Sequence, residues 1–178
     1  RSYRTTPKWS VNGKWAVMYD PIAQVWNKFD GATGKVVNIS DAIGYPMFVE
    51  SYDQPAPAPA YGIAGWTADG NHVFLYDAYD WWKVDLTGER QPECLTKGYG
   101  RKHGKSIRKM TSNIDKDVFQ KDETVIVSLW DKNTMDEGVY QLDMKGRLKK
   151  LMEGPYTYNI YRFSDNHKYC VWNRQNIT

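Results

Sequence analysis

The sequence has few of the residues that most often build metal sites and nucleophile sites. Its 178 residues include only three histidines and two cysteines, and their spacing matches no zinc site. No apolar run approaches the roughly 18 residues that cross a bilayer, and the first residues lack the apolar segment of a signal peptide. The sequence therefore predicts neither a metal site nor a transmembrane helix.

Motifs of catalysis and cofactor binding are also missing. There is no Gly-x-Ser-x-Gly turn, no glycine-rich phosphate loop and no His-Glu-x-x-His helix. We therefore expect no catalytic residue and no cofactor in this chain. The histidines, His72, His103 and His167, stand beside turns or in a basic linker, so we expect all of them on the surface.

The two cysteines, Cys94 and Cys170, fall in predicted strands of different repeats. Strands so far apart rarely bring two Cα atoms within the roughly 7 Å that a disulfide needs. We therefore predict two free, buried thiols, with a disulfide in an exported protein as the alternative.

Charge is small in total and uneven along the chain. The net charge is +3, and many of the basic residues fall in one stretch between two repeats: Lys97, Arg101, Lys102, Lys105, Arg108, Lys109 and Lys116. We expect a solvated or salt-bridged surface there, with an anion site as the alternative. Only Tyr99 is placed to stack on a base, so we expect no nucleic acid as a partner.

What the sequence does contain is a repeat. An aromatic residue followed by Asp or Asn closes a predicted strand four times, at Tyr19-Asp20, Tyr76-Asp77, Trp130-Asp131 and Trp172-Asn173. A second Asp, followed by a Gly turn, ends the next strand at Asp30, Asp85 and Asp143. Because these carboxylates recur at equivalent positions, we expect them to cap turns, not to form one special acid pair.

The repeat predicts an all-β fold, a partial β-propeller of about three and a half four-stranded antiparallel blades. One propeller fragment is expected over residues 1–178, with blade units near 1–40, 61–97, 105–153 and 158–178 and an insertion at 41–60. Phe74, Tyr76 and Trp82 are the expected core of the most complete unit, and residues 115–123 are expected to form a polar turn. The fourth unit stops after its second strand, so we expect a fragment of a longer propeller.

The insertion at 41–60 ends in alternating Pro and Ala, which favours an extended path. Insertions of this kind project from one rim of a propeller. Glu50, Tyr52, Asp53 and, in the basic stretch, Arg101 are therefore candidate rim contacts for a ligand or a neighbouring domain. The alternative is a packed surface loop without a binding role.

Three runs carry a resemblance to a known family. They are Tyr61-Gly-Ile-Ala-Gly-Trp-Thr-Ala-Asp-Gly, Leu75-Tyr-Asp-Ala-Tyr-Asp-Trp-Trp-Lys-Val-Asp and Cys94-Leu-Thr-Lys-Gly-Tyr-Gly-Arg-Lys. They resemble the amino-terminal propeller of bacterial serine peptidases similar to prolyl oligopeptidase and dipeptidyl peptidase IV. In that family the propeller caps an α/β-hydrolase domain, which carries the catalytic Ser, Asp and His.

The resemblance implies a non-catalytic propeller segment that gates substrate access. Its partners would be an α/β-hydrolase domain outside this chain and the peptide substrate, and its location the periplasm, cell envelope or exterior of a bacterium. The alternative is a stand-alone propeller-type binding module of the envelope for peptide or glycan. In isolation, the fragment is expected to self-associate through its open blade edges and faces.

Overall fold

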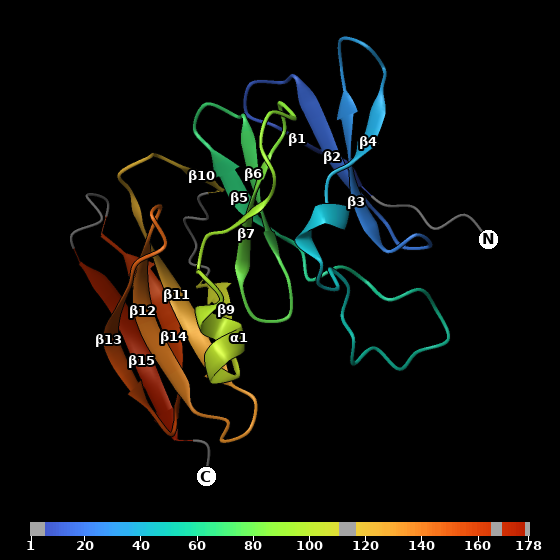
Figure 1. Ribbon diagram of the computed structural model, residues 1–178. Helices are drawn as coiled ribbons and strands as arrows, with labels where there is room; N and C mark the ends of the chain where they lie inside the picture. The colour runs from blue at the N-terminus through green and yellow to red at the C-terminus, as the bar shows by residue number, and fades with distance from the viewer. Residues whose placement is uncertain (1–5, 111–116, 165–168, 177–178) are drawn as a thin grey trace.

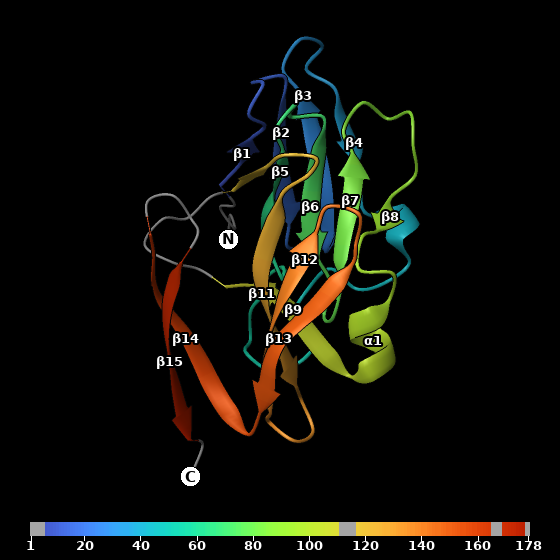
Figure 2. The same cartoon turned by 90° about the vertical axis from the view of Figure 1, so that its left-hand side faces the viewer.

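A computed structural model describes residues 6–110, 117–164 and 169–176 and shows an all-β chain (Figure 1). Three larger sheets follow one another along the sequence, and a two-stranded sheet comes last. Seen from the side, the strands of the larger sheets run in broadly similar directions (Figure 2). The structure confirms the all-β class with several four-stranded antiparallel arrangements.

Sheet 1 is an antiparallel meander of four strands in chain order. These strands are β1 (Lys8–Trp9), β2 (Trp15–Asp20), β3 (Val25–Asp30) and β4 (Val36–Asn38). A short helix, η1 (Asp41–Ile43), then leads into the insertion.

Sheet 2 has the strand order β10-β5-β6-β7-β8. Its strands are β5 (Ile63–Thr67), β6 (His72–Tyr76), β7 (Trp81–Asp85), β8 (Glu93–Cys94) and β10 (Val118–Phe119). The first four are antiparallel neighbours, whereas β10 arrives from later in the chain and pairs parallel with β5.

Sheet 3 follows the helix α1 (Tyr99–His103) and has the strand order β13-β12-β11-β9. Its strands are β9 (Lys105–Lys109), β11 (Thr124–Asp131), β12 (Glu137–Asp143) and β13 (Leu148–Gly154). The last sheet pairs β14 (Tyr156–Phe163) with β15 (Cys170–Asn176).

The repeated aspartates cap the hairpin turns, as the sequence predicts. One carboxylate oxygen of Asp20 accepts bonds from the N–H groups of Ile22 and Ala23 at 2.9 and 3.0 Å. Asp77, Asp131, Asp30, Asp85 and Asp143 accept backbone N–H groups in the same manner. Backbone N–H donors stabilise the ionised carboxylate, and they are the main reason that the pKa values of Asp30, Asp131 and Asp143 are lowered.

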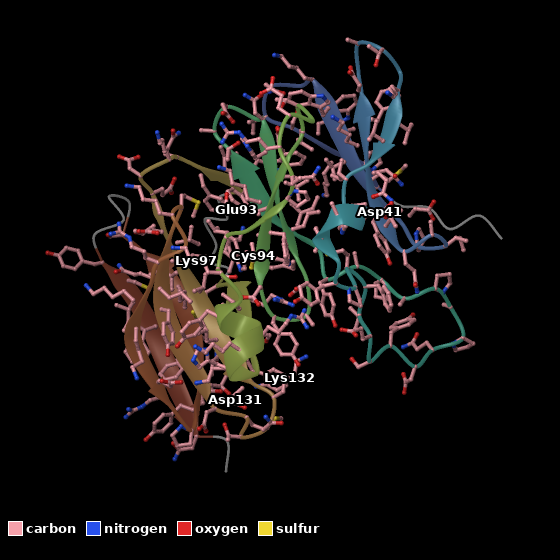
Figure 3. All side chains as sticks on the ribbon, in the orientation of Figure 1. Asp41, Glu93, Cys94, Lys97, Asp131 and Lys132 are labelled. Atoms are coloured by element: carbon pink, nitrogen blue, oxygen red, sulfur yellow. The ribbon has the colours of Figure 1, made fainter. Side chains whose placement is uncertain are left out.

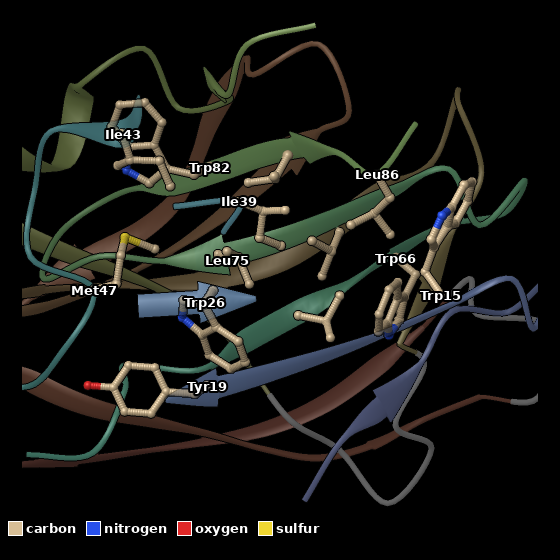
Figure 4. Close-up of a cluster of buried hydrophobic side chains, with 13 residues drawn as sticks. Trp15, Tyr19, Trp26, Ile39, Ile43, Met47, Trp66, Leu75, Trp82 and Leu86 are labelled. Carbon is tan, nitrogen blue, oxygen red and sulfur yellow. The ribbon is translucent and has the colours of Figure 1, made fainter. Parts of the chain in front are cut away.

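The core lies on both faces of sheet 2. Val73 and Leu75 of β6 face sheet 1, in a cluster that also contains Trp15 and Trp26 (Figure 4). Phe74, the residue between them, faces sheet 3 in a second cluster with residues of β9, β11 and β12. Alternate side chains of a strand point to opposite faces, so one strand serves two cores.

The expected core residues of this unit are confirmed as buried. Phe74 is 1 % exposed, Tyr76 8 % and Trp82 9 %. They do not share one face, because Trp82 belongs to the cluster toward sheet 1 and the other two to the cluster toward sheet 3.

The segment expected as a polar turn at 115–123 is partly wrong. Its described residues, 117–123, contain β10, and Phe119 is 3 % exposed. The Phe119 ring lies 5.9 Å from the ring of Phe74, centre to centre. A large apolar side chain is driven into the core despite its polar neighbours, and this burial places β10 against β5.

The insertion at 41–60 is anchored in the core at its beginning. Ile43 is 4 % exposed and Met47 2 % exposed, and both belong to the cluster between sheets 1 and 2. One isolated bridge, between Phe48 and Ala60, closes the loop that projects beyond them. The part of the insertion that projects is therefore shorter than the sequence suggests.

Sheet 1 has a second face that is apolar and exposed. Trp9, Ala16, Phe29 and Val36 stand opposite one another across its four strands. Of these, Trp9, Phe29 and Val36 are exposed, and Met18 beside them is exposed as well. We call these five residues the outer face of sheet 1.

Truncating Phe74 tests the two-sided core. Phe74→Ala should lower the free energy of unfolding by about 3 to 5 kcal/mol, because it removes a buried ring between sheets 2 and 3. The measurement is chemical denaturation followed by far-ultraviolet circular dichroism. Phe29→Ala, at a ring on the outer face of sheet 1 that is 39 % exposed, is the matched control and should change stability far less. Equal losses for both variants would contradict the assigned core.

Candidate functional site around Arg101

The turn between β6 and β7 holds two buried carboxylates. Asp77 is 0 % exposed, and one of its oxygens accepts the N–H groups of Tyr79 and Asp80 at 2.7 and 2.6 Å. The other oxygen accepts the indole N–H of Trp82 at 3.1 Å and the guanidinium of Arg101 at 2.9 Å. Asp77 therefore closes the turn and binds a cation from α1.

Asp80 joins the same turn to the backbone of α1. Its carboxylate accepts the Thr96 hydroxyl at 2.6 Å and the N–H groups of Gly100 and Arg101 at 2.9 and 3.0 Å. Position 100 has no room for a side chain, since a Cβ there would lie 2.6 Å from the carbonyl oxygen of Tyr79. The close approach allowed by glycine brings the backbone of α1 onto the carboxylate.

Arg101 connects these carboxylates to the surface. Its guanidinium lies 3.8 Å from the ring centre of Tyr45 and 5.0 Å from that of Tyr79, and its side chain remains 33 % exposed. Burial acts to lower the pKa of Arg101, but the hydrogen bond and charge of Asp77 outweigh it and the pKa is raised. The guanidinium is thus a fixed cation between two aromatic rings.

Lys132 adds a second cation to this surface. Its ammonium lies 4.2 Å from the ring centre of Tyr79, and Figure 3 places Lys132 and Asp131 at the same end of the molecule as α1. We call Tyr45, Tyr79, Arg101 and Lys132 the Arg101 rim.

A third cation, Arg108, lies behind the rim and has a structural role. It donates to the carbonyl oxygens of Ile107 and Asp77 at 2.8 and 2.7 Å. Its guanidinium lies 4.7 Å from the ring centre of Tyr76, and burial lowers its pKa. Arg108 is therefore held by carbonyls and rings, and it is not free to bind a ligand.

The chemistry of the rim is that of a binding surface. The carboxylates of Asp77 and Asp80 each accept several hydrogen bonds from the protein. Neither carboxylate is therefore placed to exchange a proton with a ligand in an open cleft. The exposed edge of Arg101 and the ammonium of Lys132 present positive charge beside two aromatic rings. Such a combination suits a carboxylate or the aromatic side chain of a peptide.

Of the predicted rim contacts, only Arg101 lies in this cluster. Glu50 is exposed and its N–H donates to the Tyr61 hydroxyl at 3.3 Å, while Tyr52 donates to Gln54 at 3.2 Å. Asp53 is exposed as well. A binding role for these three residues stays a prediction.

Tyr45, Tyr79 and Lys132 are rim residues that the sequence did not indicate. Each comes from a different connection: the insertion, the β6–β7 turn and the β11–β12 turn. The one sequence signal near these residues is the pair Asp77 and Asp80 in a turn. Two aspartates at this spacing predict that their carboxylates cap backbone N–H groups next to Tyr79.

Three of the six described residues of the basic stretch form ion pairs, Arg101 with Asp77 among them. Lys105 pairs with Glu153, and Lys109 pairs with Asp117 at 2.6 Å. Lys116 lies outside the described residues. Residues 99–103, expected as a linker, form α1, because its backbone N–H groups are held by Asp80.

Among the described residues, the histidines and cysteines give no activated nucleophile. His103 is exposed, as expected, whereas His72 is half-buried in β6, which corrects the expectation, and His167 lies outside the described residues. Cys94 and Cys170 are free but only half-buried, and burial raises the pKa of both thiols. A thiol with a raised pKa is a poor nucleophile at neutral pH.

Within residues 6–110, 117–164 and 169–176 no cluster of His, Cys, Asp or Glu is arranged to hold a metal ion. The helices in the same ranges include none with the length and apolar character that spanning a membrane requires.

No family model and no curated protein matches this chain.

Removing the Asp77 carboxylate tests the turn that holds Arg101 of the rim in place. Asp77→Ala should lower the free energy of unfolding by about 3 to 5 kcal/mol, because Arg101, Trp82 and two N–H groups lose their acceptor in a buried turn. The control is Asp131→Ala, since Asp131 caps the equivalent turn near the surface with only backbone bonds. Thermal and urea denaturation should show a clearly smaller loss for the control, and similar losses would contradict the special position of Asp77.

Proposed function

We propose that this chain is a non-catalytic propeller segment of a serine peptidase of the prolyl oligopeptidase type. In this proposal the segment restricts access to small peptides and docks on an α/β-hydrolase domain outside the chain. The resemblance to that family, which is strongest between Tyr61 and Arg108, motivates the proposal. The main support for the proposal is the packing of the sheets, because side chains at equivalent positions of the repeat face the corresponding neighbouring sheet.

The face-to-face packing follows the repeat. Aligned on Tyr19 and Tyr76, Val17 is equivalent to Phe74, and each of them faces the next sheet along the chain. Leu75 faces the preceding sheet, as does Leu129 in sheet 3. Sheet 2 thus buries one face against its predecessor and one against its successor, while sheet 1 buries a face against its successor and sheet 3 a face against its predecessor. Propeller blades pack in this way.

The outer face of sheet 1 fits this scheme. Met18 is equivalent to Leu75 and Phe29 to Val84, and both residues of sheet 2 pack against the preceding sheet. On sheet 1 the same positions are apolar and solvent-exposed. In a propeller this face would be covered by another blade.

The Arg101 rim supports a role in handling peptides. It joins connections from the insertion and from sheets 2 and 3 at one end of the sheets. Positive charge beside aromatic rings would attract the carboxylates of passing peptides.

The second candidate is a stand-alone propeller-type module of the bacterial envelope that binds peptide or glycan. The exposure of the Arg101 rim favours it, because aromatic rings also stack on sugars and peptides in binding modules. The coding sequence beyond Thr178 separates the two candidates. A downstream Gly-x-Ser-x-Gly with later Asp and His supports the peptidase segment, and their absence from the complete gene leaves the binding module.

Activity assays on the isolated protein give a direct prediction. The purified 178-residue chain should not hydrolyse peptide or ester substrates, because no activated nucleophile is present among its described residues. Fluorogenic dipeptide substrates with a serine-directed inhibitor are the assay. Turnover that the inhibitor abolishes would contradict the non-catalytic role.

Self-association tests the blade interpretation of the outer face of sheet 1. We expect the protein to associate at micromolar concentration, because a few hundred Å² of apolar area at about 25 cal/mol per Å² gives several kcal/mol before the entropic cost. Phe29→Lys should shift the equilibrium toward monomer in sedimentation velocity. Ile22→Lys, an exposed apolar residue in the β2–β3 turn, is the control. A monomeric wild-type protein would contradict the expectation.

A further inference from the structure

A groove lies between sheets 2 and 3, at the end of β6 opposite the Arg101 rim. Its volume is about 410 Å³, within the range of pockets that bind small organic molecules. Its walls come from the β5–β6 turn, β6, β7, the segment after β10 and the β12–β13 turn. Phe74 and Phe119 form its base, with Ala68 and Met144 on its sides.

Positive charge dominates the lining of this groove. Lys83, Lys121 and Lys145 line it together with one carboxylate, Asp69. That carboxylate is already engaged by the Thr67 hydroxyl at 2.6 Å and the Asn71 N–H at 2.9 Å. Across the part of the chain that the structure describes, none of the three ammonium groups has an ion-pair partner.

The repeat provides an internal comparison for Lys83. Lys28 stands at the equivalent position of sheet 1, since it pairs across from Val17 as Lys83 pairs across from Phe74. Lys28 donates to the carbonyl oxygen of Leu86 in the next sheet. Lys83 is also partly buried but has no such acceptor in the described ranges, so its ammonium is left available for a ligand.

His72, on the same wall, carries a buried polar atom that is unsatisfied. Its Nδ1 is buried without a hydrogen-bond partner among the described residues. Burial, and then the charge of Lys83, lower the pKa of His72, which favours the neutral ring. A buried ring nitrogen without a partner is costly unless another group bonds to it.

We propose that this groove binds an organic anion with an apolar body. Lys83, Lys121 and Lys145 hold the carboxylate or phosphate group, and the body lies between Ala68 and Met144 over the two phenylalanine rings. Gly146 follows two lining residues, Met144 and Lys145, and lies so close to the Leu95 carbonyl that a side chain has no room there. This site is independent of the peptidase proposal, because it uses neither the rim nor the outer face of sheet 1.

Four small molecules separate the contribution of the anionic group to binding from that of the apolar body. Isothermal titration and nuclear magnetic resonance should show 2-naphthoate and 2-naphthyl phosphate binding, with the largest shifts at His72 and Phe74. Neutral 2-naphthylmethanol has the apolar body without the charge, and acetate has the charge without the body. Both should bind at least about tenfold more weakly. Equal binding of the neutral probe, or shifts at other residues, would overturn the proposal.

Matched variants test the lysines. Lys121→Gln with Lys145→Gln should weaken 2-naphthoate binding about tenfold or more, with an unchanged melting temperature. Lys35→Gln with Lys102→Gln removes the same charge at exposed positions outside the groove and should leave binding within about twofold. Ala68→Phe fills the groove from an exposed position and should abolish binding. Equal effects of both lysine pairs, or undiminished binding to Ala68→Phe, would refute the site.

Discussion

Burial of both faces of sheet 2 is the constraint on which the rest of the molecule depends. Within β6, Val73 and Leu75 complete one core while Phe74 completes the other. Full burial of each such side chain stabilises the fold by about 1.5 to 3 kcal/mol. Because both faces of this sheet are apolar, charged side chains lie chiefly at the ends of its strands. Both the Arg101 rim and the lysine-lined groove lie there, at opposite ends of β6.

The sequence predicts best where the interactions are local. Asp20, Asp77 and Asp131 cap turns through N–H groups two or three residues away, so their role follows from spacing alone. The burial of Phe74 follows from the strand pattern. By contrast, the pairing of β10 with β5 joins residues about 50 positions apart, and no local pattern encodes it. Loop segments take their places from such distant contacts, which a single sequence does not reveal.

The two candidate binding surfaces differ in what the sequence could indicate. Arg101 belongs to a visible basic stretch, yet its partners Tyr45 and Tyr79 come from separate connections and only the fold unites them. The groove has no motif at all, because Lys83, Lys121 and Lys145 stand on three different segments. In both cases, residues from several separate segments form the surface together. The stacking of the sheets brings these segments to one place.

The short strand β10 makes adjacent repeats mutually dependent. The N–H of Trp66 in sheet 2 donates to the carbonyl of Asp117 at 2.7 Å, and that of Ala68 donates to Phe119 at 3.0 Å. Both acceptors belong to the segment between β9 and β11, which are neighbouring strands of sheet 3. These amide hydrogens at the β5 edge of sheet 2 are thus shielded only while sheet 3 is folded, so we expect the two repeats to open as one cooperative unit instead of fraying one at a time.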